Sequence, residues 1–211
     1  MVHSRFLLAA LACLSLVAAS PAAAREPVRI LAFGDSLTAG YGLPDTAGFT
    51  AQLTAALAKM GRPAVVINGG VSGDTSAGGV QRIDWALADR PQIVILELGA
   101  NDALRGLDPG EMKANLLAIT ARAKAAGAAV LLAGMLAPRN LGADYVAAYD
   151  AVYPAIAQAE GVDLYPFFLD GVAGRPELNQ ADGLHPTAEG VAIIVARLLP
   201  SLTRIMDRLP Q

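Results

Sequence analysis

Residues 28–42 read Val-Arg-Ile-Leu-Ala-Phe-Gly-Asp-Ser-Leu-Thr-Ala-Gly-Tyr-Gly. They consist of an apolar run followed by a loop of glycines and small polar residues. The run 28–33 is largely apolar and ends in turn residues, which is typical of a buried strand. The glycines that follow allow a sharp turn and a close approach to a ligand. Open α/β sheets bind ligands at the carboxyl ends of their strands. We therefore expect Ser36 to point its hydroxyl into a binding crevice.

Residues 34–42 could instead form a phosphate-binding loop or an ordinary turn between a strand and a helix. A P-loop needs a lysine after its last glycine, and the dinucleotide-binding fingerprint needs spaced glycines where Asp35 and Ser36 stand. Neither pattern is present. Ser36 is thus a candidate nucleophile, provided that other segments supply a base, an orienting acid and an oxyanion hole.

Further apolar runs alternate with segments of helical pattern along the chain. The expected strands are residues 64–67, 93–98, 129–133 and 162–164, and the expected helices are residues 49–59, 79–88, 109–126, 143–160 and 187–199. Strands that alternate with helices in this way predict a parallel sheet covered on both faces. We therefore expect an α/β fold, a three-layer α/β/α sandwich around a mainly parallel five-stranded sheet.

Residues 1–24 have the composition of a secretory signal peptide. A positively charged start precedes an apolar stretch over residues 6–17, and Ala22–Ala24 offers small residues at a cleavage site. We expect cleavage after Ala24, which leaves a single domain over residues 25–211 in a periplasmic or secreted protein. Lipoprotein processing at Cys13 is the alternative, but it would leave an apolar segment on the mature chain.

The charged residues argue against several classes of partner. The 211-residue chain has 16 basic and 19 acidic residues and a net charge of −3. Cleavage would remove Arg5, His3 and Cys13, so the mature chain would carry −4 and keep His185 as its one histidine. Without a basic patch we expect no nucleic-acid partner. We also expect no metal, no cofactor and no stable membrane anchor after cleavage.

Residues 182–186, which read Asp-Gly-Leu-His-Pro, could supply the base and the orienting acid. Imidazole is the usual general base near neutral pH, and an acid three residues earlier could hold the useful tautomer of His185. Asp182 could also be a turn residue, and His185 a neighbour of a helix cap. The candidate oxyanion donors are the backbone N–H groups of Ser36 and Gly73 and the side-chain amide of Asn101. Gly73 and Asn101 could equally serve only as turn or cap residues.

Four segments together resemble the GDSL, or SGNH, hydrolases, and among these the bacterial periplasmic branch of thioesterase I, lysophospholipase and arylesterase. The segments are Gly-Asp-Ser-Leu at 34–37, Ser-Gly-Asp-Thr at 72–75, Glu-Leu-Gly-Ala-Asn-Asp at 97–102 and Asp-Gly-Leu-His-Pro at 182–186. The resemblance spans about residues 28–199 and implies a flavodoxin-like fold without a cofactor. Ala100 stands where this branch often has a second glycine.

The resemblance also implies the roles of the site residues. Ser36 would be the nucleophile, His185 the base and Asp182 its partner, while Ser36, Gly73 and Asn101 would donate to the oxyanion. The expected activity is hydrolysis of carboxylic acyl esters and thioesters, lysophospholipids included, through an acyl-enzyme. The substrate would be a small acyl ester or thioester. Apolar candidates for contacts with its acyl chain are Leu104, Leu136, Pro138, Leu141 and Phe168.

Other functions would fit parts of the same sequence. A carbohydrate O-acetylesterase would use the same site residues and differ in its preference for acetyl. A non-catalytic extracytoplasmic binding protein is disfavoured by the complete set of site residues. A flavodoxin-like nucleotide binder is disfavoured by the signal peptide and the missing phosphate loop. The Gly-x-Ser-x-Gly elbow of α/β-hydrolases is absent, which disfavours that class of serine hydrolase.

Overall fold

The structure is a computed structural model, and it describes residues 26–210. All neighbouring strands are parallel and form one sheet in the order β2-β1-β3-β4-β5, which is the order of flavodoxin-like folds. The strands are β1 (Val28–Gly34), β2 (Ala64–Gly70), β3 (Ile93–Glu97), β4 (Ala129–Ala133) and β5 (Asp163–Tyr165). The expected parallel five-stranded sheet is therefore confirmed. The expected signal peptide, residues 1–24, lies outside the described residues.

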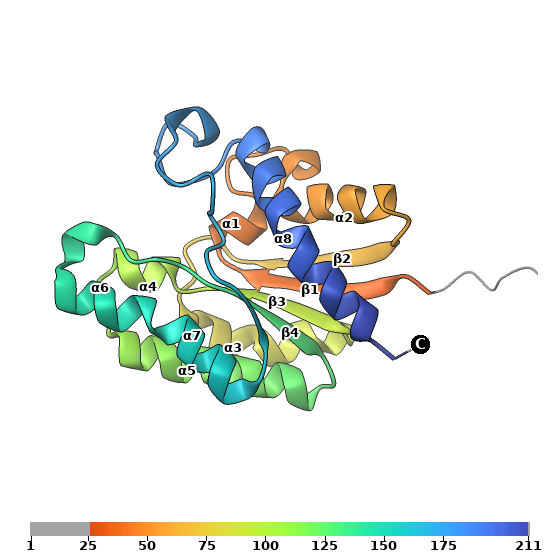
Figure 1. Cartoon of the computed structure of the whole chain (residues 1–211), viewed down its shortest axis with the longest axis horizontal. Helices are drawn as coiled ribbons and strands as arrows, with labels where there is room; N and C mark the ends of the chain where they lie inside the picture. Colours follow the sequence, from red (N-terminus) through yellow and green to blue (C-terminus); the bar gives the residue numbers. More distant parts are fainter. Residues whose placement is uncertain (1–25, 211) are drawn as a thin grey trace, which may run out of the picture.

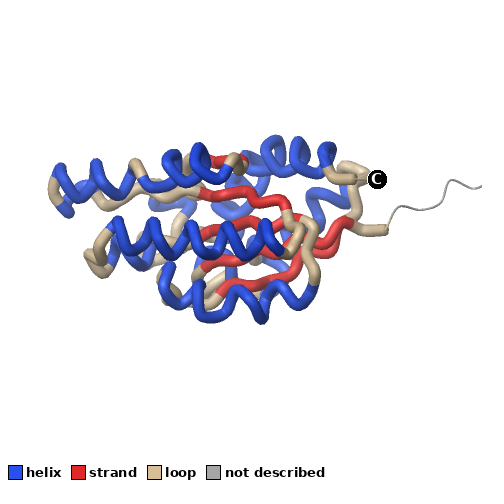
Figure 2. Tube along the Cα trace, turned by 90° about the horizontal axis from the view of Figure 1, so that it is seen from below, coloured by secondary structure: helices blue, strands red, loops and turns tan. Residues whose placement is uncertain are grey.

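Helices cover both faces of the sheet, as Figures 1 and 2 show. Helices α2 (Phe49–Lys59) and α8 (Ala188–Arg208) pack on one face. The other face is covered by α3 (Ser76–Ala86), α5 (Pro109–Ala125) and α7 (Val152–Glu160), with α6 (Ala143–Asp150) leading into α7. The short helices α1 (Ser36–Ala39) and α4 (Ala100–Leu104) follow β1 and β3. Among residues 26–210, no helix combines the length and the apolar character needed to cross a membrane.

Two helices differ from the sequence expectation for physical reasons. Residues 143–160 were expected to form one helix, but they form α6 and α7. Pro154 explains the break, because it cannot donate a hydrogen bond to the carbonyl of Asp150, where α6 ends. The last helix was expected over residues 187–199, with residues 201–211 either continuing it or fraying, and the structure shows that it continues to Arg208 despite a proline in its interior. Its additional turns bury Leu202 and Ile205 in the core, which stabilises them.

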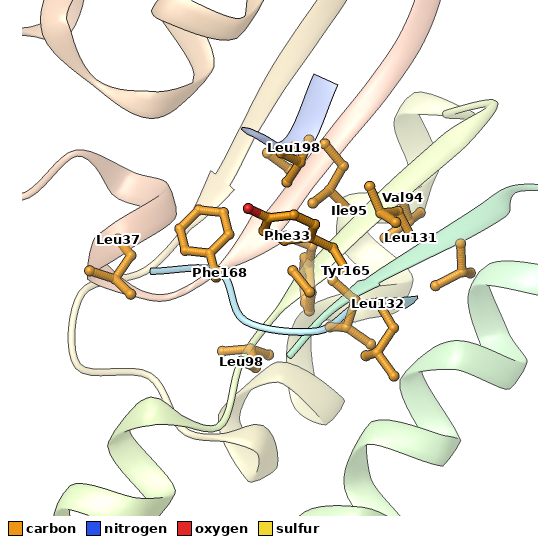
Figure 3. Packing of buried hydrophobic residues seen from close by; sticks show 14 of the residues in the cluster. Phe33, Leu37, Val94, Ile95, Leu98, Leu131, Leu132, Tyr165, Phe168 and Leu198 are labelled. Carbon is orange, nitrogen blue, oxygen red and sulfur yellow. The ribbon is translucent and has the colours of Figure 1, made fainter. Parts of the chain in front are cut away.

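The core lies between the sheet and its two helical layers. Residues 30–33 of β1 are at most 1% exposed, as expected for a strand that is covered on both faces. Figure 3 shows Phe33 among side chains from other strands and from the segment that carries Phe168. The buried sheet thus forms a close-packed base, and the loops at its carboxyl edge carry the polar residues of interest.

Candidate active site

The predicted site residues meet at the carboxyl edge of the sheet. Ser36, Gly73 and Asn101 follow β1, β2 and β3, and β1 lies between the other two strands. His185 arrives from the loop before α8, although 149 residues separate it from Ser36 in the chain. The topology therefore brings together segments that are far apart in sequence.

Three side chains form a continuous hydrogen-bonded series. His185 Nε2 lies 2.9 Å from Ser36 Oγ, and His185 Nδ1 lies 2.7 Å from Asp182 Oδ2. Asp182 Oδ1 also accepts the backbone N–H groups of Leu184 at 2.9 Å and His185 at 3.0 Å. The backbone and ring bonds from His185, with that from Leu184, lower the pKa of Asp182 to about 2. An ionised carboxylate at this position favours the tautomer that presents a bare Nε2 to the serine hydroxyl.

Hydrogen bonds and a ring contact connect the loop of His185 to the loop of Ser36. Gln180 Nε2 donates to the carbonyl oxygens of Tyr41 at 2.8 Å and Pro186 at 3.0 Å. The Tyr41 ring lies over the imidazole, with 4.5 Å between the centres of the rings. Gly42 has a φ of 73°, and a Cβ there would lie 2.2 Å from the Gln180 amide oxygen. Sequence analysis missed Gln180 and Tyr41, because the contact depends on how two distant loops fold.

The turn that presents Ser36 is built from short-range contacts. Ser36 is the first residue of α1, and Asp35 caps this helix by accepting the N–H of Leu37 at 3.0 Å. Gly40 ends the helix in a left-handed conformation, with a φ of 85°. A Cβ at Gly34 would lie 2.1 Å from the Thr38 hydroxyl, so only glycine fits where β1 passes under this turn.

Three N–H donors are available near the serine. Within residues 26–210, the backbone N–H groups of Ser36 and Gly73 have no hydrogen-bond acceptor. The Asn101 amide donates to Asp35 Oδ2 at 3.0 Å, and its second N–H is free for a ligand. N–H donors of this kind stabilise negative charge on a ligand oxygen that lies within hydrogen-bond distance of them.

Arg82 of α3 holds the loops after β1 and β2 together. Its guanidinium donates to the carbonyl oxygens of Gly69 at 2.6 Å and Gly34 at 2.8 Å, and it pairs with Asp74 at 2.7 Å. The guanidinium carbon also lies 3.9 Å from the centre of the Phe33 ring. Sequence analysis missed Arg82, since an arginine within a helical pattern is ordinarily a solvated surface residue.

Two tyrosines hold the loop that leads to Asn101. Tyr149 donates to the carbonyl oxygen of Gly99 at 2.8 Å, and Tyr153 donates to that of Leu98 at 2.9 Å. Gly99 has a φ of 122°, and a Cβ there would lie 2.2 Å from the Tyr153 hydroxyl. The spacing of four residues between the tyrosines was an available sequence signal, because it would place both on one side of the single helix that was expected over residues 143–160.

The five predicted acyl contacts do not share one environment. Leu104 and Leu136 are 54% and 41% exposed, and Pro138 and Leu141 are partly exposed. Phe168, which was also expected to contact the acyl chain, differs from these four in its environment. It is 1% exposed and packs edge-on against Phe49 in the core, with 5.1 Å between ring centres.

A cavity of about 720 Å³ lies away from these residues. Its lining includes Val28, Arg62, Gln92 and Met206, at the end of the sheet opposite Ser36. It is large but contains none of the predicted site residues, so size alone does not identify the site. In the part of the chain that is described, no cluster of three or more His, Cys, Asp or Glu side chains could hold a metal ion.

The family follows from a comparison with known proteins. The model of the GDSL-like lipase/acylhydrolase family matches residues 32–193, which is most of the chain. The chain belongs to this family. The matched range includes Ser36, Gly73, Asn101, Asp182 and His185, so the GDSL-like family model covers the entire candidate site.

Individual relatives of this GDSL-like hydrolase agree with that assignment. Esterase TesA of Pseudomonas aeruginosa is 40% identical over 92% of this chain and 96% of its own. Thioesterase 1/protease 1/lysophospholipase L1 of Escherichia coli is 38% identical over 88% of each chain. The crystal structure of AlinE4, an SGNH-hydrolase family esterase, is 45% identical and superimposes with a TM-score of 0.74. That match covers 90% of this chain and 100% of AlinE4, which confirms the predicted resemblance and fold.

Proposed function

We propose that this carboxylic ester hydrolase acts through a triad of Ser36, His185 and Asp182. One observation carries the proposal: the imidazole of His185 bridges the serine hydroxyl at 2.9 Å and the aspartate at 2.7 Å. A hydroxyl needs an adjacent base to become a nucleophile, and the base needs a third group that orients it. The family assignment supports ester hydrolysis as the reaction.

In the proposed reaction, Ser36 Oγ attacks the acyl carbonyl carbon while His185 Nε2 takes the hydroxyl proton. The carbonyl oxygen becomes an oxyanion that accepts from the N–H groups of Ser36 and Gly73 and from the Asn101 amide. His185 then returns the proton to the departing alcohol or thiol, which leaves an ester on Ser36. Water attacks this acyl-enzyme while His185 takes its proton. His185 then returns the proton to Ser36 Oγ, which releases the acid product and regenerates the free serine.

We propose that the substrates are acyl esters and thioesters. The printed names of the relatives, an esterase and a thioesterase/lysophospholipase, support this range. Leu104, Leu136, Pro138 and Leu141 follow β3 and β4 at the edge that carries Ser36, where they could contact the acyl chain. Hydrolysis rates over esters of increasing acyl length test this, and a sharp maximum at acetyl would favour a carbohydrate O-acetylesterase instead. The composition of residues 1–24 supports a periplasmic or secreted location.

The variant Ser36→Ala tests the triad. We expect it to lose hydrolysis of a p-nitrophenyl ester and labelling by a fluorophosphonate, while its far-ultraviolet circular dichroism matches that of the wild type. Thr54→Ala, at a half-buried position of α2 where the hydroxyl donates to the Thr50 carbonyl of the same helix, is a control away from Ser36 that should keep both signals. Ester hydrolysis by Ser36→Ala at the wild-type rate would refute the proposal.

A further inference from the structure

Glu97 is a fully buried acid beneath the turn of Ser36 that the proposed reaction does not use. It is the last residue of β3, and β1 pairs it with Gly34. Its Oε2 accepts the Thr38 hydroxyl at 2.8 Å and the backbone N–H of Asp35 at 3.3 Å. Its Oε1 is buried and has no hydrogen-bond partner among the described residues. Glu97 therefore contacts both ends of the turn that presents Ser36.

Glu97 and Asp35 form a pair of buried acids without a counter-ion. Both are 0% exposed, and within residues 26–210 neither lies within 4.0 Å of a basic group. Two neighbouring carboxyl groups in a site of low dielectric do not both ionise, because burial and mutual repulsion oppose the second charge. One member of the pair must therefore hold a proton at neutral pH.

The hydrogen bonds indicate which acid holds that proton. Asp35 accepts a donor on each oxygen, from the Leu37 N–H and the Asn101 amide, and such bonds favour the ionised form. Glu97 has both of its donors on Oε2, so Oε1 can carry the proton without displacing a bond. An ionised Asp35 also orients the Asn101 side-chain amide, because it accepts a charge-assisted hydrogen bond from that amide.

We propose that Glu97 is an uncharged positioning residue, which holds the Ser36 turn through Thr38 and leaves Asp35 ionised to orient the Asn101 amide. This inference rests on the proposed function of Ser36 and Asn101 and adds a requirement to it. The carboxyl must be present as a hydrogen-bond acceptor, but its charge must be absent.

The electrostatic surroundings agree with this assignment. Burial, reinforced by Asp35, raises the pKa of Glu97 well above its usual range, whereas burial raises the pKa of Asp35 only to about 6. His185 lowers and Asp74 raises the pKa of Asp35. The remaining groups that face the pair are the neutral hydroxyls of Tyr149 and Tyr153 from α6 and α7, whose pKa values burial raises. Arg82 of α3 donates to the Gly34 carbonyl and pairs with Asp74, and it forms no ion pair with Glu97 or Asp35 among the described residues.

Three variants separate the acceptor from the charge. Glu97→Gln keeps a carbonyl oxygen for Thr38 and cannot ionise, so kcat should stay within about threefold of the wild type. Glu97→Met keeps a similar length without an acceptor. Thr38→Val removes the donor. Each of the last two should lower kcat by about 10- to 100-fold at an unchanged KM, because small displacements of a nucleophile have costs of this size. Glu111→Gln, at an exposed acid of α5, should match the wild type.

The measurements are kcat and KM for a p-nitrophenyl ester from pH 6 to 10, with circular dichroism to verify folding. A kcat for Glu97→Gln as low as that of Glu97→Met would overturn the uncharged role. Wild-type kcat in both Glu97→Met and Thr38→Val would overturn the positioning role. If Glu97→Met does not fold, Thr38→Val decides that point alone. Activity in Ser36→Ala would instead refute the proposed function, so the two failures are distinguishable.

Discussion

Replacing Glu97 by Gln should change how the stability of the protein depends on pH. In the unfolded chain this acid ionises near its ordinary pKa of 4.5, whereas burial in the folded protein raises its pKa well above that value. Above pH 4.5 the unfolded state therefore releases a proton that the folded state retains, and the free energy of unfolding falls as the pH rises. Gln does not titrate, so the free energy of unfolding of the variant does not decrease with pH for this reason.

The size of the effect follows from the linkage of proton binding and folding. Each pH unit between the unfolded and folded pKa values lowers the wild-type free energy of unfolding by about 1.4 kcal/mol relative to the variant. Glu97 is 0% exposed, so solvent does not screen this contribution. Between pH 5 and pH 7 the two proteins should therefore diverge by up to about 1.4 kcal/mol for each pH unit over which folded Glu97 keeps its proton, against a typical domain stability of about 5–15 kcal/mol. Asp35 titrates in both proteins, and its contribution largely cancels in the difference.

Urea unfolding followed by far-ultraviolet circular dichroism at pH 5, 6 and 7 measures this divergence. Fluorescence is a poorer probe, because the one tryptophan, Trp85, is 83% exposed and changes its environment little on unfolding. Glu111→Gln is the control and should follow the wild-type curve. Parallel curves for the wild type and Glu97→Gln would show that Glu97 ionises alike in both states, and the reasoning about the buried pair would be wrong.

Two further predictions concern the groups around Ser36. Asn101→Ala should lower kcat by about 10²–10³-fold with the fold retained, because one oxyanion donor is lost; steady-state kinetics that match the wild type would exclude Asn101 from that role. Arg82→Gln should lower the free energy of unfolding in urea by about 2 kcal/mol, since the carboxylate of Asp74 loses its partner in a half-buried site. Arg175→Gln, at the exposed pair with Glu177, should change stability by less than about 0.5 kcal/mol, and equal losses in both variants would contradict this account.

The elements with strong patterns were predictable from the sequence. Strand β4 and helix α2 have the expected bounds, because an apolar run fixes one and a regular apolar face fixes the other. The break at Ala151 was missed although Pro154 signals it, because a proline in the interior of a helix breaks or kinks it. In the structure Pro154 lies in the first turn of α7, where a proline is tolerated. The length of β2 was underestimated, because its last residues, Asn68–Gly70, are not apolar and pair with β1 through the backbone.

The site residues were predictable where their chemistry is rare in this chain. His185 is the one imidazole beyond residue 24, so its role as base had no competitor. The burial of Phe168 was not predictable, because an apolar residue can line a cleft or fill a core and its sequence neighbours do not distinguish the two. The partner of Glu97 was not predictable either. It follows from the register that sets Gly34 against Glu97 and so brings Thr38 above that acid.

The side chains that hold the loops of Ser36, Gly73 and Asn101 in place come from other helices and strands than the loops themselves. Arg82 of α3 holds the loop before Gly73, the tyrosines of α6 and α7 hold the loop before Asn101, and Glu97 of β3 holds the turn of Ser36. Arg82 and the tyrosines donate to backbone carbonyl groups, and Glu97 accepts from the Thr38 hydroxyl and the Asp35 N–H. None of these contacts uses the N–H groups that are proposed to face a substrate. Changes at these supports should therefore move the donors relative to the serine and act on kcat, whereas changes at exposed Leu104 or Leu136 should act on KM through the acyl chain.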